Sequence, residues 1–241
     1  MSDSAPGSRT AYTWTSATAN SLGGPLLVCE ADAFAHWGGA EHGPDGEPDP
    51  ACDFGRALSA VDDEETGFIR FGDHGEHKGL LWDMEGEGTA EIALSADGFL
   101  LLRSWLPQGR TAAPRRRAAG ASPAEETEVG DLEVPGGRVV VAWAAAGARE
   151  NDIGSFADPG ERAAALRALA RLHPPVPLHL DHVLHVGALL STEPGIYRVS
   201  SGWHEGTRGR SMPVEESDGS PRATGDDDWS CVWVRFTRRG H

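Results

Sequence analysis

The stretch SLGGPLLVCEADAFAHWGG, residues 21–39, decides how the chain begins to fold. Two glycines and a proline stand before an apolar run that ends at Cys29. A phosphate-binding loop places its glycines after a strand and before a helix, and usually adds a lysine. Here the glycines precede the apolar run, and Pro25 lacks a backbone N–H donor. The stretch therefore predicts a tight turn that leads into a buried β-strand, and it does not predict a phosphate site.

Outward from this strand, residues 13–106 alternate short apolar runs with glycine-containing turns, which is typical of antiparallel strands. The runs that predict a meander are GFIRFG (67–72), GLLWDM (79–84), TAEIALS (89–95) and GFLLLRSWL (98–106). A short helix is predicted before them, with Asp49 as its N-cap and Pro50 in its first position. The helical spacing of four apolar residues gives it one buried face, formed by Phe54, Ala57, Leu58 and Val61.

The second half of the chain is predicted to open with a strand over residues 132–147. A helix follows, in which Asp158 and Glu161 form a capping box around Pro159, and the pair Pro174-Pro175 ends it. Three further strands are predicted, over residues 183–191, 195–203 and 229–237. The polar stretch between the last two predicts a long loop, and long loops on a rigid scaffold often carry function.

These elements predict an α+β fold dominated by short antiparallel strands, in meanders or hairpins, with two main helices. The expected organisation is a flexible tail (1–12), an α+β half (13–106), a linker (107–130) and a second β-rich half with one helix (131–241). The linker contains almost no large apolar side chain and cannot offset its ordering entropy, so its run of three arginines is expected to be solvated.

The two halves resemble each other in sequence. The segment GGPLLVCEADA (23–33) aligns with GGRVVVAWAAA (136–146), and each half ends on an arginine-containing aromatic strand, LLLRSW or VWVRFT. Two alternatives stay open: an internal duplication that produced two similar halves, or a chance match of glycine and alanine.

Charge is the strongest bulk property. Asp and Glu number 37 against 21 Lys and Arg, which gives a net charge of −16. Such a chain has no general basic surface for nucleic acid or anionic lipid, and its charge would steer it towards a basic partner. Three scattered cysteines predict reduced thiols in a cytoplasmic protein. The chain shows no targeting signal and no apolar run long enough to span a membrane.

Metal and catalytic motifs are weak. The turn GDHGEHKG, residues 72–79, holds the best metal candidates, which are Asp73, His74, Glu76 and His77. A zincin needs two histidines four apart on a helix, whereas these are three apart in a glycine-flanked turn, where they are expected to face water. Neither GxSxG, nor SxxK, nor a cysteine beside a histidine is present. We therefore expect no enzyme activity and no cofactor or metal.

Eight tryptophans are a second unusual feature. Several stand beside polar segments, and tryptophan is enriched both in cores and at the centres of interfaces. The sequence leaves packing and partner contact open for these side chains, which are Trp14, Trp37, Trp82, Trp203 and Trp229.

Taken in order, the motifs W-x(6)-SLGGPLLV, HWGG, DFGRAL, GFIRFG, GLLWD and DGFLLLRSW resemble the immunity protein 21 family. That family consists of small bacterial cytosolic proteins of polymorphic toxin systems. The resemblance covers residues 14–106. This chain departs from the family in WDMEGEGT, where members carry a GDEP-like turn, and in two long acidic segments at 41–50 and 214–228. The resemblance implies that variable loops of this kind determine which toxin is bound.

The resemblance and the charge predict an immunity protein, monomeric when free, that binds a cognate toxin and occludes a basic active-site cleft with acidic loops. The expected toxin contacts are Trp37, Glu41, Asp45, Glu47, Asp62, Asp63, Glu64, Glu65, Trp203, Asp226, Asp227, Asp228 and Trp229. Two alternatives remain: a metal-dependent hydrolase that uses the turn at residues 73–77, and a β-rich binding or scaffold protein without a toxin partner.

Overall fold

The computed structural model describes residues 11–61, 66–84, 86–105, 112–147, 158–180, 184–205 and 229–240. The first half contains β1 (Thr13–Ser21), β2 (Leu26–Glu30), α1 (Ala31–Phe34), α2 (Asp53–Val61), β3 (Thr66–Phe71), β4 (His77–Trp82), β5 (Gly88–Ser95) and β6 (Gly98–Trp105). A connection follows with α3 (Ala112–Gly120) and the 3-10 helix η1 (Pro123–Glu125). The second half contains β7 (Thr127–Val134), β8 (Arg138–Trp143), α4 (Pro159–Leu169), β9 (Val176–Leu180), β10 (Leu184–Ser191), β11 (Gly195–His204) and β12 (Ser230–Arg238).

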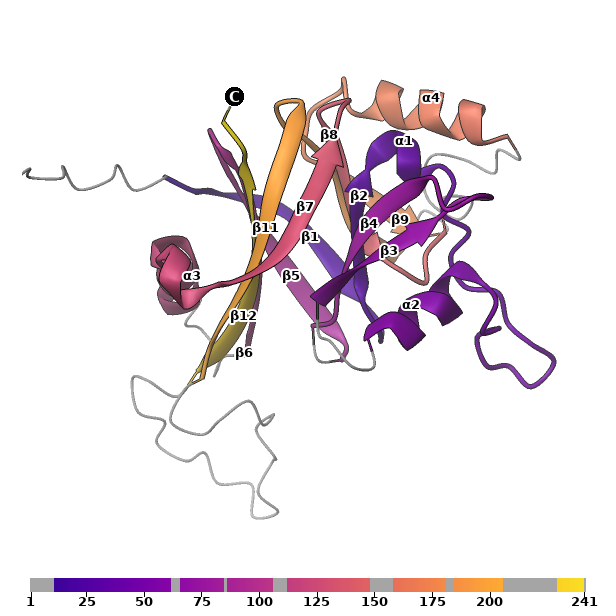
Figure 1. Ribbon diagram of the computed structural model, residues 1–241, viewed down its shortest axis with the longest axis horizontal. Coiled ribbons are helices and arrows are strands. Elements are labelled where there is room, and N and C mark those ends of the chain that lie inside the picture. The colour runs from indigo at the N-terminus through magenta and orange to yellow at the C-terminus, as the bar shows by residue number, and fades with distance from the viewer. Residues whose placement is uncertain are drawn as a thin grey trace, which may run out of the picture.

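The strands form two six-stranded antiparallel sheets, which face each other in Figure 1. Sheet A has the order β1-β5-β6-β12-β11-β7, and sheet B has the order β3-β4-β2-β8-β10-β9. The predicted α+β, strand-dominated fold is therefore confirmed. Each sheet takes three neighbouring strands from each half, so the expected boundary between residues 106 and 131 does not separate two bodies.

The two halves are similar, as one of the two alternatives predicted. Apart from α1, they repeat one order of elements, with β1 to β6 matching β7 to β12 and α2 matching α4. At the centre of sheet B, Val28 pairs with Val141, its own counterpart in the aligned segments, as a two-fold axis requires. The turn before each of these strands contains a glycine with positive φ, Gly24 at 76° and Gly137 at 65°. Such a backbone strongly favours glycine.

The apolar side chains form three layers of core. The central layer lies between the sheets and includes Val28, Leu101 and Val234. A second layer lies between the outer face of sheet B and the helices α1, α2 and α4, on the right in Figure 1. A smaller layer on the outer face of sheet A lies against α3 and includes Ala118 and Trp233. The protein thus has four layers of secondary structure, which are α3, sheet A, sheet B and the helices on sheet B, with one layer of core between each neighbouring pair. Burying each large aliphatic side chain contributes roughly 1.5–3 kcal/mol, and this burial holds the layers together.

The described part of the expected linker is structured, contrary to the prediction. Residues 112–134 form α3, η1 and β7. Arg115 pairs with Glu91, and its guanidinium lies 5.0 Å from the centre of the Trp14 ring. Arg117 lies 5.5 Å from the centre of the Trp233 ring. Small residues form the buried face of α3, and the two arginines extend it by placing their guanidinium groups over aromatic rings.

Several boundaries also differ from expectation. The stretch 132–147 forms the end of β7 and all of β8, separated by the glycine turn, and β9 was not predicted. Helix α2 begins at Asp53, because Asp49 instead caps a preceding turn by accepting a hydrogen bond from the Ala51 N–H. Helix α4 begins as predicted, with the Asp158 carboxylate accepting from the Glu161 N–H. A flexible tail was expected over residues 1–12, of which residues 1–10 lie outside the described residues. Tyr12 does not belong to a free tail, because its hydroxyl accepts a hydrogen bond from Arg235 at 2.8 Å.

The arginines that end the two halves are not equivalent, although their strands are neighbours. In the β6–β12 ladder, Arg103 pairs with Val232 of the central core, and Arg235 pairs with Leu100 of the outer layer. Because side chains alternate between the faces of a sheet, the two arginines point to opposite sides of sheet A. This part of the sequence likeness is coincidental.

The cysteines should differ sharply in reactivity. Burial raises the pKa of the Cys231 thiol to about 12 and raises that of Cys29 well above its usual value, while Cys52 is only partly buried. Because the thiolate is the reactive form, we expect a disulfide reagent at pH 8 to label one thiol of the native chain and all three after unfolding. The Cys52→Ser variant should show no native labelling. Fast labelling of a second thiol in the native protein would contradict this burial pattern.

Candidate functional site

The acidic loop, residues 41–49, projects from the body between α1 and α2 (Figure 1). Its base is closed by a hydrogen bond from the Asp49 N–H to the Glu41 carbonyl, 2.7 Å, and by a bridge between His42 and Pro48. Nearer the tip, the Gly43 N–H donates to the Glu47 carbonyl at 2.8 Å. The loop is therefore a small hairpin that is closed by its own backbone hydrogen bonds.

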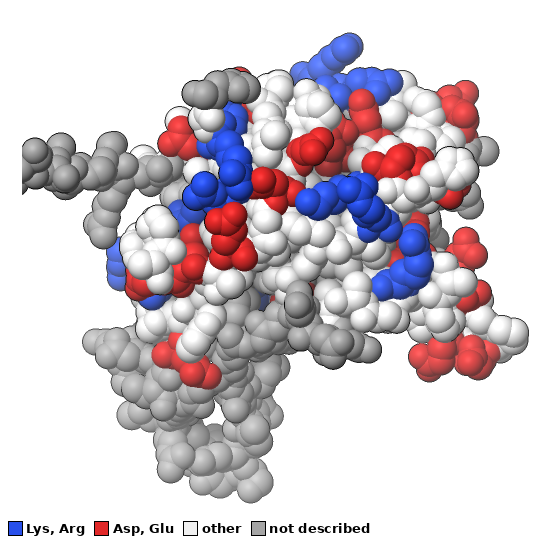
Figure 2. Space-filling model, in the orientation of Figure 1, with Lys and Arg blue, Asp and Glu red and all other residues white. Residues whose placement is uncertain are grey.

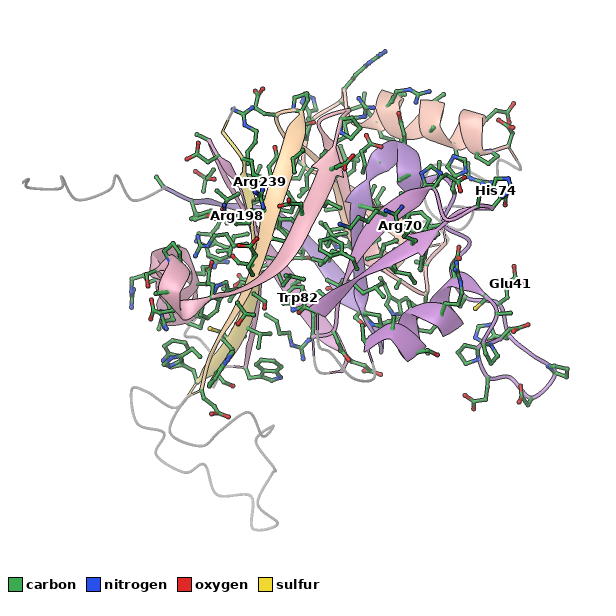
Figure 3. All side chains as sticks on the ribbon, in the orientation of Figure 1. Glu41, Arg70, His74, Trp82, Arg198 and Arg239 are labelled. Atoms are coloured by element: carbon green, nitrogen blue, oxygen red, sulfur yellow. The ribbon has the colours of Figure 1, made fainter. Side chains whose placement is uncertain are left out.

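The side chains of the acidic loop are strongly exposed. Four of its residues are carboxylates, and none is lysine or arginine, as Figure 2 shows at the lower right. All four are exposed, and among the described residues none of them forms an ion pair; they are Glu41, Asp45, Glu47 and Asp49. Figure 3 places Glu41 on the outer side of the loop. The loop thus carries a concentrated negative charge with no internal neutralisation.

The root of the loop is tied to the helix that follows it. The Asp53 carboxylate accepts a hydrogen bond from the Gly38 N–H at 2.7 Å and pairs with Arg56. An open hollow of about 260 Å³ at this point is lined by residues that include Glu41 and Asp49. These contacts fix where the loop leaves the body.

Trp37 is buried in the core, which contradicts its prediction as a toxin contact. Its side chain is 1 % exposed, and its indole N–H donates to the Ala144 carbonyl at 2.7 Å. Its ring meets Phe71 edge-on, with ring centres 5.1 Å apart. The residue comes just after α1, whose buried face directs it into the core against sheet B.

Trp203 and Trp229 stand at the far end of sheet A, away from the acidic loop (Figure 1). Trp203 is 53 % exposed, and Trp229 stacks on His204 with ring centres 4.2 Å apart. The remaining predicted contacts lie outside the described residues; they are Asp62, Asp63, Glu64, Glu65, Asp226, Asp227 and Asp228. The structure thus separates the described acidic and aromatic candidates into two ends of the molecule.

Of the four metal candidates in the β3–β4 turn, two lie apart and two meet a third potential ligand. Asp73 and His74 are exposed, as expected, and His74 is at the right edge in Figure 3. Glu76 is exposed too, whereas His77 is partly buried, and both meet His36, which follows α1 and was not predicted. No sequence signal could have identified His36, because its partners are about forty positions away along the chain.

A larger hollow of about 720 Å³ opens on the outer face of sheet A, beside α3 and η1. The buried carboxylate of Glu126 lies in its wall and accepts hydrogen bonds from Arg235, Trp233 and Ser200. The arginines at its rim are paired; Arg239, for example, lies 2.8 Å from Asp131. The sequence did not indicate this region, because residue 126 lies in the predicted linker. Its polar groups satisfy one another, which is typical of a structural network.

Comparisons of the chain with protein families, with curated proteins and with solved structures found no match. In the described part of the chain, every helix is too short or too polar to cross a membrane.

Proposed function

We propose that this protein is an immunity protein that binds a cognate bacterial toxin, with its acidic loop occluding a basic cleft of the toxin. The observation that carries the proposal is the loop itself, a projecting hairpin with four exposed carboxylates. A preformed loop loses little conformational entropy on binding. Concentrated negative charge also accelerates encounter with a basic partner, which suits an inhibitor that must act before the toxin does.

The acidic loop forms only part of the proposed interface, because a stable complex buries about 800 Å² on each partner. The exposed Trp203 is a second proposed contact, since tryptophan supplies a large rigid contact area. Because Trp203 and the acidic loop lie at different ends of the molecule, this second contact requires a toxin that reaches from one end to the other. In this proposal the free protein is monomeric, acts in the cytoplasm, and uses neither nucleic acid nor a membrane as its partner.

The test removes charge from the loop and keeps its shape. In the triple variant Glu41→Gln, Asp45→Asn, Glu47→Gln, the Asn retains an oxygen that can accept the 3.2 Å hydrogen bond from the Glu47 N–H. We expect the association rate with the toxin domain encoded beside the gene to fall about tenfold or more at low salt. The difference should disappear near 1 M salt, where the screening length is about 3 Å.

The matched control removes the same charge from exposed carboxylates elsewhere, in the variant Asp97→Asn, Glu133→Gln, Glu161→Gln. It should bind the toxin as the unmodified protein does. If the unmodified protein neither binds this toxin nor rescues growth, the immunity function is wrong. If it binds and the loop variant associates equally fast, the toxin is neutralised but the acidic loop is not the contact.

A further inference from the structure

A second cluster of polar side chains lies outside the acidic loop. His36, Glu76 and His77 offer ligand atoms that all lie within 4.8 Å of one another. They come from two separate segments, the residues after α1 and the turn between β3 and β4. The imidazole rings of His36 and His77 contact each other in a tilted arrangement, with centres 4.3 Å apart and an angle of 35° between the ring planes.

The core holds the two imidazoles of this cluster in place, whereas the Glu76 side chain is 45 % exposed. The buried rings of Trp37 and Phe71 meet edge-on, and the Phe71 ring centre is 5.6 Å from that of His77. His36 adjoins Trp37 in the chain, and its backbone N–H donates to the Ala33 carbonyl at 2.9 Å. One series of rings therefore runs from the core to the cluster. Both imidazoles are positioned before any ligand arrives, which reduces the cost of binding.

The nitrogen Nε2 of His77 has no hydrogen-bond partner among the described residues, although it is shielded from solvent. The nearest carboxylate oxygen, Oε1 of Glu76, is 3.6 Å away, which is too far for a hydrogen bond. Buried polar atoms are nearly always satisfied, so an unpaired nitrogen that faces a carboxylate and a second imidazole calls for a ligand. A cation between the three side chains would satisfy it.

We propose that His36, Glu76 and His77 bind a divalent transition-metal ion such as Zn²⁺. Imidazole nitrogens with one carboxylate favour zinc and its neighbours over calcium or magnesium, which prefer oxygen ligands alone. The three ligand atoms lie within 4.8 Å of one another, so they would have to draw closer together for each to reach the usual metal–ligand distance of about 2.0–2.2 Å. The ion would tie the β3–β4 turn to the segment between α1 and the acidic loop.

The backbone at Gly72 leaves room for the cluster. Its φ is +88°, and a Cβ there would lie 2.8 Å from the His77 ring.

The test is titration of the full chain, free of any histidine tag, with Zn²⁺ at pH 7.5 by calorimetry. We expect one ion per chain. The variants His36→Phe and His77→Phe keep an aromatic ring in the stack and remove the nitrogens. Each should weaken binding about tenfold or more, since even a lost supporting contact of a metal site costs 10–100-fold. His74→Ala, in the same turn but outside the cluster, should bind as the unmodified chain does.

A second histidine pair provides a further control. His179 and His185 have ring centres 5.4 Å apart, so His185→Gln tests whether the ion binds there. The proposal is overturned if the unmodified chain binds no stoichiometric Zn²⁺, or if His36→Phe and His77→Phe bind as tightly as His74→Ala. Thermal unfolding without metal shows whether each variant is folded before it is titrated. The experiment uses no toxin, so its failure would leave the proposed function untouched.

Discussion

Replacing Glu126 by alanine is expected to lower the free energy of unfolding by about 3–5 kcal/mol. The Glu126 side chain is 4 % exposed, and its carboxylate accepts hydrogen bonds of 2.8 Å from both the Arg235 guanidinium and the Trp233 indole. Its second oxygen accepts from the Ser200 hydroxyl at 2.6 Å. The Arg235 side chain is only 12 % exposed, and alanine at position 126 would leave its positive charge without a counter-ion. An uncompensated buried charge is one of the few single changes that cost this much.

The measurement is urea unfolding of Glu126→Ala beside Glu128→Ala. Glu128 is also glutamate and also near arginines, at 3.8 Å from Arg198 and 3.6 Å from Arg239, but its side chain is 58 % exposed. Exposed pairs contribute about 0–1 kcal/mol, so Glu128→Ala should be nearly neutral. Similar small losses for both variants would show that the Glu126 network does not hold α3 and η1 on sheet A.

The fold class could be predicted from the sequence because it depends on local patterns. Glycine turns and alternating apolar runs mark the strands, and Asp158 with Pro159 marks the start of α4. The linker prediction for residues 107–130 was wrong because the described part of this segment packs through arginine side chains over aromatic rings and through a buried carboxylate. A prediction that counts only large apolar side chains takes no account of such contacts.

The candidate sites could be predicted only where exposure follows from local sequence. Apart from His42, the acidic loop contains only glycine, proline and carboxylates, with no large apolar side chain to bury, so its exposure was foreseeable. Trp37 and Trp203 both adjoin glycine and histidine, yet one is buried and the other half exposed. What separates them is the layer that covers each, and that layer is formed by residues distant in sequence. The same limit concealed His36 as the partner of His77.

The largest effect is expected from separating the two halves of the chain. Each sheet is joined at its centre by strands from different halves, β6 with β12 and β2 with β8. A single half would therefore expose two unpaired strand edges and half of the core between the sheets. We expect residues 1–108 and 109–241, produced separately, to lack the cooperative unfolding transition of the intact chain as monomers.

Produced together, the two pieces should form a 1:1 complex, because the central ladders need no covalent connection. This complex should have the same circular dichroism spectrum as the intact protein and a similar unfolding transition. The pseudo-two-fold relation adds a sharper expectation for the first piece alone. Since Val28 pairs with its own counterpart Val141, a second copy of β2 can occupy the place of β8 in the same antiparallel register. Any folded form of residues 1–108 should therefore be a dimer in analytical ultracentrifugation, weakened by Val28→Asp at the shared axis. A folded monomer of this piece would contradict the prediction. It would mean that the first half can bury its own core, and that it folds without the pairings of β6 with β12 and β2 with β8.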